Sequence, residues 1–398
     1  MQVVVAGGGP AGAIAARTLA KSGIRTILFE AAPGADKPCG GALPSMLLDA
    51  YPVPELIIKN RSYGVTFQGP SGIQVPIDFP DGLYIALVQR CDFDSHLRFT
   101  AEDAGATLVR GRVLSFEDKG NQLMVHYKDS DGTKRTTEAD FIIAADGAVS
   151  RMAKQVMGRQ LNSVIAIQDE FKVSQDKIDA LENRCLFNYS PAVSPDFYGW
   201  IFPKDGTVSI GIGTDLNQRE KANGFLERMK EIHKEFIDGG THTKRNGAMI
   251  PMEQYKLHGY KRVLLTGDSA GLVLPAAGEG IYFAMRSGEI AANAISEFSK
   301  ERPDLVVQKY TDRVNSEFGP IFKYWMRVQN VAYKSTFNRE TFVRLASDKF
   351  MGQKILKAFA SKSYVPTPIA KRMQILMYLL SIRANVYFHS SREPDFGK

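Results

Sequence analysis

The first thirty residues carry two apolar runs separated by a glycine-rich turn and a helical segment. QVVVA (2–6) is a short, continuously apolar run that is typical of a buried strand. AIAARTLAKSG (13–23) follows GGGPAG and indicates a helix that ends at Gly23, and TILFE (26–30) indicates a second strand that ends at Glu30. This order predicts a β-α-β unit at the start of the chain.

A second pattern is the alternation of aromatic residues in SPDFYGWIFP (194–203). In an extended chain, side chains two positions apart point to the same face. Tyr198, Trp200 and Phe202 are therefore expected to form one apolar wall, with Gly199 and Ile201 on the other side. From the pattern alone, this wall packs against the protein's own core or lines a cavity for an apolar ligand.

The glycine turn has the spacing of a dinucleotide-binding motif. Gly7, Gly9 and Gly12 form G-x-G-x-x-G between the first strand and the helix, which allows a pyrophosphate to approach the backbone at the helix N-terminus. Glu30 ends the second strand and is placed to accept hydrogen bonds from an adenosine ribose. The motif serves both NAD and FAD, so a further feature has to decide between them.

Segments far along the chain favour FAD. KRVLLTGDSAG (261–271) reads as a strand ending at Gly267-Asp268, and a glycine turn then opens a long helix within residues 276–295. This arrangement resembles flavoproteins of the glutathione-reductase type, in which such an Asp holds the ribityl chain. FIIAADGAVSR (141–151) and VQRCDFDSHL (88–97) resemble segments of their hydroxylase-like branch. The residues assigned to the cofactor are Gly7, Gly9, Pro10, Ala11, Gly12, Glu30, Gly40, Gly41, Arg90, Asp146, Asp268, Gly278, Gly280 and Ile281.

Composition narrows the setting. The chain has 398 residues, which allows two packed lobes, and it has three scattered cysteines, too few for a disulfide framework or a zinc site. No signal peptide is expected, because MQVVVAGGG leads directly into a strand, and a reducing cytoplasmic setting fits. No metal-ligand cluster and no Ser-His-Asp arrangement is visible.

Positive charge gathers in the last quarter. From Lys300 onward there are 18 Lys and Arg against 8 Asp and Glu. Residues 364–388 contain an uncharged core (373–382) that is too short to cross a bilayer but could lie on an anionic membrane surface. The alternative is a packing helix with a solvated basic rim. A nucleic-acid partner is not expected, because no dense basic run or binding motif is present.

Two further motifs narrow the flavoprotein class. KPCGGALP (37–44) and the string carried by Pro195, Tyr198, Trp200, Phe202 and Pro203 resemble the geranylgeranyl reductase family, most closely the branch acting on chlorophylls and bacteriochlorophylls. One departure is Ala276-Ala277, where that branch is expected to carry Ser, sometimes with Cys. The departure bears on the substrate and not on FAD binding.

The resemblance implies an α/β chain, α+β overall. A glutathione-reductase-type, Rossmann-like FAD-binding domain would comprise residues 1–60, 85–160 and 260–298. A substrate-binding domain with an antiparallel sheet would comprise 61–84 and 161–259, followed by a basic C-terminal helical region (299–398). Tyr198, Trp200 and Phe202 would then bind an isoprenoid chain beside the flavin.

The implied reaction is hydride transfer from reduced FAD to a prenyl C=C bond, with NADPH or reduced ferredoxin as electron donor. Cys39 is the first candidate for the proton donor, and its alternative role is a small buried residue in a tight turn. Two other functions stay open at this point: an FAD-dependent aromatic hydroxylase or monooxygenase, and a non-catalytic flavin- and lipid-binding protein. The head group, the number of bonds reduced and the oligomeric state do not follow from the residues.

Overall fold

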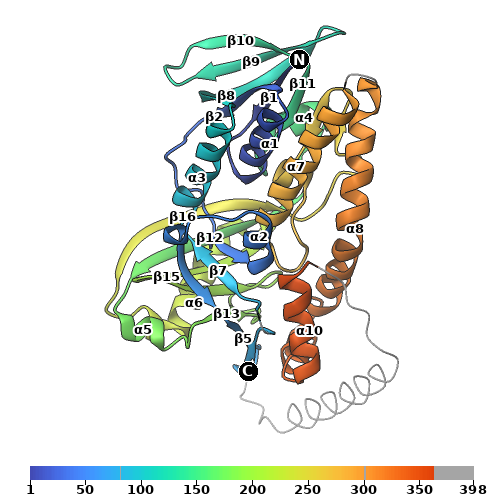
Figure 1. Cartoon of the computed structure of the whole chain (residues 1–398). Coiled ribbons are helices and arrows are strands. Elements are labelled where there is room, and N and C mark those ends of the chain that lie inside the picture. The colour runs from blue at the N-terminus through green and yellow to red at the C-terminus, as the bar shows by residue number, and fades with distance from the viewer. Residues whose placement is uncertain (81, 300–301, 363–398) are drawn as a thin grey trace.

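The computed structural model describes residues 1–80, 82–299 and 302–362, and Figure 1 shows two large sheets, one above the other, flanked by long helices. The upper sheet has the strand order β10-β9-β8-β2-β1-β11-β18-β17. Its strands are β1 Gln2–Ala6, β2 Arg25–Glu30, β8 Thr107–Asp118, β9 Leu123–Asp129, β10 Lys134–Ala139, β11 Phe141–Ala144, β17 Gly259–Tyr260 and β18 Val263–Leu265.

The predicted β-α-β unit is confirmed at the centre of this sheet. β1 pairs in parallel with β2 on one side and with β11 on the other. The helix that connects β1 to β2, α1 Pro10–Lys21, begins three residues earlier than its apolar pattern predicted. Pro10 occupies the first helical turn, where its missing N–H costs nothing. Val3, Val4 and Val5 are fully buried, as expected for a parallel strand covered on both faces.

Helices cover this sheet. α3 Arg90–Asp103 and α7 Ile281–Phe298 both pack against α1, and α4 Arg151–Met157 lies beside β8. Gly288 of α7 makes the close approach to α1 possible, since a Cβ there would lie 2.2 Å from the Ala11 carbonyl oxygen. The N-termini of α1 and α7 consequently meet at the same edge of the sheet.

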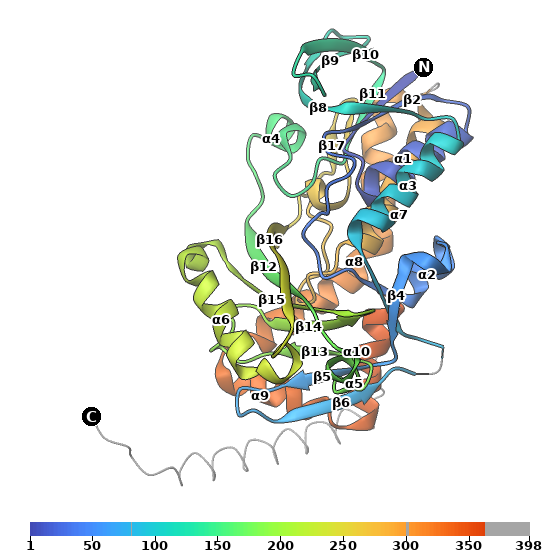
Figure 2. The ribbon, with the colours of Figure 1, turned by 90° about the vertical axis from the view of Figure 1, so that its left-hand side faces the viewer.

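The lower sheet has the order β16-β12-β15-β14-β13-β5-β6. It is antiparallel throughout except for the pairing of β13 with β5, which is parallel. A three-stranded sheet, β3-β7-β4, contacts β14 of the lower sheet through β7 and β4, and Figure 2 shows β4 beside that sheet. The strands concerned are β3 Ala42–Pro44, β4 Ile58–Ser62, β5 Gly64–Gln68, β6 Gln74–Asp78, β7 Ile85–Val88, β12 Ser163–Lys172, β13 Arg184–Asn188, β14 Gly199–Lys204, β15 Thr207–Asp215 and β16 Thr241–Pro251.

Three C-terminal helices complete the described part of the chain. α8 Val306–Ala332 runs along one side of the molecule, from the upper sheet to the lower (Figure 1), and α9 Thr336–Leu345 and α10 Lys349–Ala360 follow beside the lower sheet. Short helices fill the connections: α2 Ser45–Ala50, α5 Gln175–Asp179, α6 Ala222–Ile232, and the 3₁₀ turns η1 Glu55–Ile57, η2 Leu216–Lys221, η3 Lys234–Phe236, η4 Gly267–Ala270 and η5 Pro303–Leu305.

One apolar core joins both sheets. It extends from β1 through Trp200 of β14 to Ile355 of α10, so the lobes are packed as a unit. A separate cluster, which includes Ile201 and Leu226, lies between the lower sheet and α6. β14 therefore contributes to a different core from each of its faces.

Candidate functional site

The glycine turn leaves an open space at the N-terminus of α1. Gly7 has φ +106°, and a Cβ on it would lie 2.3 Å from the Ala145 carbonyl oxygen; a Cβ on Gly12 would lie 1.8 Å from that of Gly7. Gly9 differs, because a Cβ there would meet nothing within 4 Å. Gly7 and Gly12 thus serve the packing, while Gly9 faces empty space beside a helix end without a side-chain cap. This arrangement fits the pyrophosphate of a dinucleotide.

Glu30 lies directly beside this turn. Its Oε2 accepts the Gly8 N–H at 2.8 Å, and its Oε1 accepts the Ala32 N–H at 2.9 Å. The buried Arg98 of α3 donates to the Gly8 carbonyl at 3.0 Å and also to Pro33, so it fixes the same turn. The sequence analysis missed Arg98, which belongs to no motif of the sequence.

Asp268 and the start of α7 form the other wall of the cofactor end. Asp268 lines the cavity and makes an ion pair with Lys37, with 3.9 Å between Nζ and Oδ2. Gly280 is the N-cap residue of α7 and has no side chain that could cap the helix. Gly280 and Ile281 both line the cavity. A ligand's negative charge is stabilised at such a helix end. The structure therefore brings Asp268 and the α7 N-terminus together beside the glycine turn.

Asp146 lies differently from the other predicted cofactor residues. Its carboxylate accepts hydrogen bonds from the Ser150 hydroxyl and from the N–H groups of Arg151 and Met152, so it serves the start of α4. Burial raises the pKa of Asp146, although these hydrogen bonds oppose the effect. Its neighbours Ala145 and Gly147 line the cavity. A cofactor contact in this segment remains a prediction, and the structure offers backbone for it.

Cys39 lies in the loop that joins the two ends of the cavity. Its Sγ accepts the Gly41 N–H at 3.3 Å, and its carbonyl accepts from Gln168 Nε2 at 3.2 Å. Gly41 has φ +76° and approaches Val88 so closely that a Cβ would lie 2.1 Å from the Val88 carbonyl oxygen. Gly40, Gly41 and Cys39 all line the cavity, so this loop is held with the thiol at its wall.

Arg90 is buried next to Cys39. It donates two hydrogen bonds to the Asp94 carboxylate, at 3.0 and 2.8 Å. Burial by itself would lower the pKa of Arg90, but the charge and hydrogen bonds of Asp94, together with the nearby Cys39 side chain, outweigh burial and the pKa is raised. Arg90 is therefore a fixed cation at the cavity wall.

The aromatic wall borders the same cavity. Tyr198, Trp200 and Phe202 line it, while Ile201 points to the separate core on the other side, so the predicted alternation is confirmed. The strand is shorter than expected: β14 begins at Gly199, and the residues before it form a bend. The Tyr198 hydroxyl donates to the Ala277 carbonyl at 2.6 Å, which ties the wall to the turn before α7.

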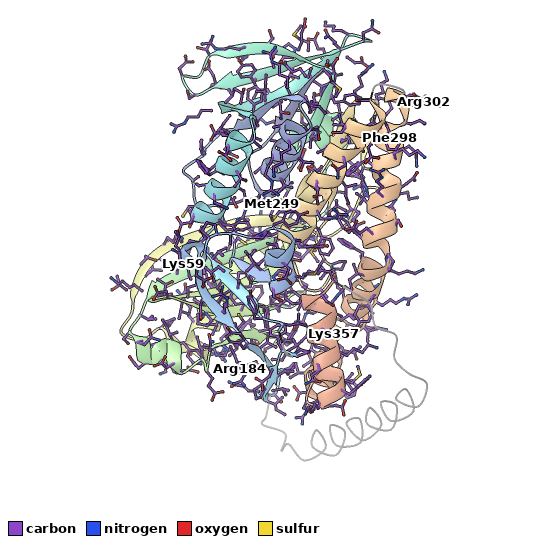
Figure 3. All side chains as sticks on the ribbon, viewed as in Figure 1. Lys59, Arg184, Met249, Phe298, Arg302 and Lys357 are labelled. Atoms are coloured by element: carbon purple, nitrogen blue, oxygen red, sulfur yellow. The ribbon has the colours of Figure 1, made fainter. Side chains whose placement is uncertain are left out.

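Long-range elements close the apolar end. Trp325 of α8, Phe342 of α9 and three residues of α10 line the cavity opposite the wall; the three are Ile355, Leu356 and Phe359. Met249 of β16 lines it as well and lies between the two large sheets in Figure 3. The result is a largely apolar enclosure, which is the kind of site that holds a hydrocarbon ligand.

A buried arginine supports the wall. Arg339 of α9 is 1% exposed. It donates hydrogen bonds of 2.7 to 3.1 Å to four carbonyl groups of the loop that leads into β14. These carbonyls belong to Tyr189, Ser194, Pro195 and Phe197. Sequence reasoning missed Arg339, because nothing local in α9 distinguishes it from a solvent-exposed arginine.

Four buried polar atoms on the cavity make no hydrogen bond and no ion pair within the described residues. They are Gln168 Oε1, Asn246 Oδ1 and the indole Nε1 atoms of Trp200 and Trp325. Buried polar groups are usually hydrogen-bonded, and those that are not call for a bound molecule or water. Together with the open space at Gly9, these atoms fit a cavity built to receive a polar cofactor next to an apolar ligand.

Comparison with known proteins agrees with this geometry. Residues 1–37 and 74–316 match the family described as FAD binding domain, which covers more than half of the chain and defines an FAD-dependent flavoprotein of the oxidoreductase class. The chain is 35% identical over 381 residues to a chloroplastic geranylgeranyl diphosphate reductase of Arabidopsis thaliana, covering 92% of this chain and 81% of that one. It is 32% identical to a geranylgeranyl diphosphate reductase of Rhodobacter capsulatus, covering 93% and 94%. The chain belongs to the geranylgeranyl reductase family.

A solved structure shows the same fold. A geranylgeranyl bacteriochlorophyll reductase-like protein from Thermoplasma acidophilum superposes with a TM-score of 0.79 at 22% identity, covering 96% of this chain and 98% of that one. The predicted fold class, an FAD-binding domain with a Rossmann-like sheet, a second sheet and C-terminal helices, is confirmed. Family membership also decides against the hydroxylase and non-catalytic alternatives.

Proposed function

We propose that this protein saturates C=C bonds of a geranylgeranyl chain carried as the diphosphate or on a chlorophyll-type pigment. The observation that carries the proposal is one cavity with two unlike ends. Asp268 and the glycine turn line one end. The aromatic wall that includes Trp200 and the C-terminal helices enclose the other end. A slender, unsaturated hydrocarbon suits an enclosure of flat rings.

The chain's residues divide the work of the reaction. When bound and reduced, FAD supplies a hydride to one carbon of the alkene. The rings of Tyr198 and Trp200 exclude water and stabilise the positive charge that develops on this same carbon as the other carbon is protonated. Cys39, whose thiol is at the cavity wall, gives the other carbon its proton. The two electrons of the hydride and the proton together balance the reduction of one double bond.

The first experiment identifies the substrate and the electron donor. The FAD-loaded protein is reduced without air by NADPH or by reduced ferredoxin, and bleaching of the flavin shows which of the two is the donor. Geranylgeranyl diphosphate or a geranylgeranylated pigment is then added, and mass spectrometry counts the hydrogens gained. We expect flavin reoxidation together with a mass gain of two hydrogens per bond reduced. Reoxidation only on admission of oxygen, with hydroxylated product, would refute the proposal.

A second experiment addresses the role of Cys39. Cys39→Ser and Cys39→Ala should be reduced by the donor at the normal rate, while flavin reoxidation by the prenyl substrate slows by roughly 10²–10⁴-fold, as for a lost general acid. Cys91→Ala is the matched control, because Cys91 is half-buried on α3 and is not among the residues that line the cavity. Normal reoxidation in either Cys39 variant would make Cys39 a turn residue only.

We further propose that the protein works in the cytoplasm at a membrane surface. In the described part of the chain no helix is long and apolar enough to cross a membrane. The segment 364–388, which could lie on such a surface or pack as a helix with a solvated basic rim, falls outside the described residues, but the region from Lys300 onward is strongly basic. Sedimentation with anionic and with neutral vesicles tests this idea. Binding to both kinds equally, or to neither, would contradict the electrostatic attachment.

A further inference from the structure

A buried ion pair joins two distant parts of the chain at the cavity. Lys362 follows α10, and its Nζ lies 2.7 Å from Oε2 of Glu279, the residue before Gly280. The two side chains are only 3% and 6% exposed. Within the described residues, Glu279 is the one acidic side chain within ion-pair distance of Lys362. A buried pair of this kind is costly to desolvate and is a weak source of stability, which makes a functional role worth seeking.

The surroundings of Lys362 are aromatic. Its Nζ is 4.2 Å from the ring centroid of Phe359 and 5.6 Å from that of Phe283. Ring faces attract a cation and so help to keep it in this apolar setting. Burial lowers the pKa of Lys362, and the charge of Glu279 opposes this effect. The two rings and the Glu279 carboxylate therefore hold the Lys362 ammonium group in one position.

Glu279 sits at the N-terminus of α7. Its side chain lines the cavity, and its Oε1 accepts the Tyr282 N–H at 2.9 Å, which is one of the free donors of the first helical turn. A helix N-terminus carries partial positive charge that stabilises nearby anions. A carboxylate at that place cancels part of this charge, unless a cation neutralises the carboxylate in turn.

We propose that Lys362 is a positioning residue that neutralises Glu279 and so leaves the α7 N-terminus available to stabilise the negative charge of reduced FAD. The inference rests on the proposed function, with FAD at the end of the cavity that Asp268 and the α7 N-terminus border. It assigns to Lys362 a share in setting the flavin's reduction potential.

The physical reason is charge balance. Reduction adds negative charge to the ring system, and fixed charges near the site decide how readily it is accepted. With Lys362 in place, the pair has no net charge. With Lys362 removed, the Glu279 carboxylate faces the reduced flavin unopposed. A role limited to tying α10 to α7 would change the stability of the protein and leave the potential of the bound flavin unchanged.

The first test uses the protein without flavin. Thermal unfolding is measured for Lys362→Met, Glu279→Gln and the double variant. Lys362→Met should lower the midpoint most, because it strands a buried carboxylate, and adding Glu279→Gln should recover part of the loss. Lys357→Met is the control, since Lys357 is an exposed residue of α10, the helix that precedes Lys362 (Figure 3), and should leave the midpoint unchanged. Strictly additive losses would show that the two residues do not act as a pair.

The second test measures the midpoint potential of the bound flavin by anaerobic dye titration, with no prenyl substrate present. Lys362→Met should disfavour the reduced flavin about tenfold, a fall of about 29.6 mV for a two-electron couple. Glu279→Gln should raise the potential, and the double variant and Lys357→Met should stay close to the unmodified protein. Equal potentials in all variants would overturn the proposal.

Two variants keep the test decisive if Lys362→Met does not fold. Lys362→Arg retains the charge and should show a normal potential, and Glu279→Gln alone should still raise it. An unchanged potential in Glu279→Gln would refute the inference. Because no prenyl substrate is used, a wrong assignment of the substrate leaves this result untouched, and the two proposals fail separately.

Discussion

At the Gly9 end the cavity is walled largely by backbone, whereas at the Trp200 end it is walled by side chains. The first end is formed by turns next to two helix N-termini, and its key glycines are close in the chain. The second end is assembled from β14 and from α8 to α10, which lie more than a hundred residues further on. The first end therefore tolerates no added atom at Gly7 or Gly12, while the second depends on buried partners from distant elements.

Each end of the cavity has its own optical probe. It contains only two tryptophans, Trp200 and Trp325, and both line the aromatic end. Indole fluorescence therefore reports on that end, and the absorbance of bound flavin reports on the other. The predictions below use both signals to test whether the ends respond independently.

The largest effect is expected at the glycine turn. Gly12→Val should give largely colourless protein, because even a Cβ there would lie 1.8 Å from the Gly7 carbonyl oxygen. Gly9→Ala should fold normally, since its Cβ meets nothing within 4 Å, but should lose flavin if the pyrophosphate occupies that space. Asp268→Ala should also reduce the flavin content. Normal flavin in Gly12→Val and Asp268→Ala would overturn the cofactor assignment.

The next effect concerns the support of the aromatic wall. Arg339→Met removes a buried cation that bonds four carbonyl groups, and it should destabilise the protein by on the order of 1–3 kcal/mol for each carbonyl that is left buried without a partner. Urea unfolding followed by indole fluorescence measures this loss. Arg327→Met, an exposed change on α8, should have little effect. Equal stability of the two variants would mean that the loop is held by other contacts.

Trp200→Ala and Ile201→Ala test the two faces of β14. Trp200→Ala should impair turnover of the long substrate, with flavin content and fold near normal. Ile201→Ala is the control, because Ile201 is fully buried in the separate core and should cost about 2–5 kcal/mol with per-molecule activity unchanged. If Trp200→Ala instead lowers the melting temperature strongly and leaves activity intact, the aromatic wall is only core.

The smallest effect is a pH dependence at the outer side of the lower sheet. Burial alone would raise the pKa of Asp169, but hydrogen bonds from Arg245 and Lys230 outweigh it and bring the pKa to about 2. A depressed pKa stabilises the fold above the unfolded value of 3.8, and this contribution is lost as pH falls toward about 2. We expect a loss on the order of 2 kcal/mol across that window.

The measurement is the urea midpoint of indole fluorescence between pH 7 and pH 2.5. Asp169→Asn should be less stable than the unmodified protein at neutral pH, and the difference should shrink as the pH falls below about 4. Asp176→Asn on the exposed surface serves as the control. A difference that is constant over the whole range would indicate lost packing and not a lost charge.

Much of the cofactor end was predictable because its information is local. A strand, Gly7, Gly9, Gly12, a helix and Glu30 follow one another, and the backbone geometry of a tight turn depends on the residues within it. The alternation that puts Trp200 and Phe202 on one face is local for the same reason, since strand geometry has a period of two.

Tertiary structure decided what those faces meet. Whether the wall of β14 would border a cavity depended on α8, α9 and α10. The hydrogen bond from Arg339 to Phe197 and the ion pair of Lys362 with Glu279 span 142 and 83 positions in the chain. For Asp146 the cofactor contact remains a prediction, and the fold shows in addition that its carboxylate serves the start of α4. A side chain's neighbours in sequence set its direction, but the cost of burying its charge is met by partners that only the folded chain brings into reach.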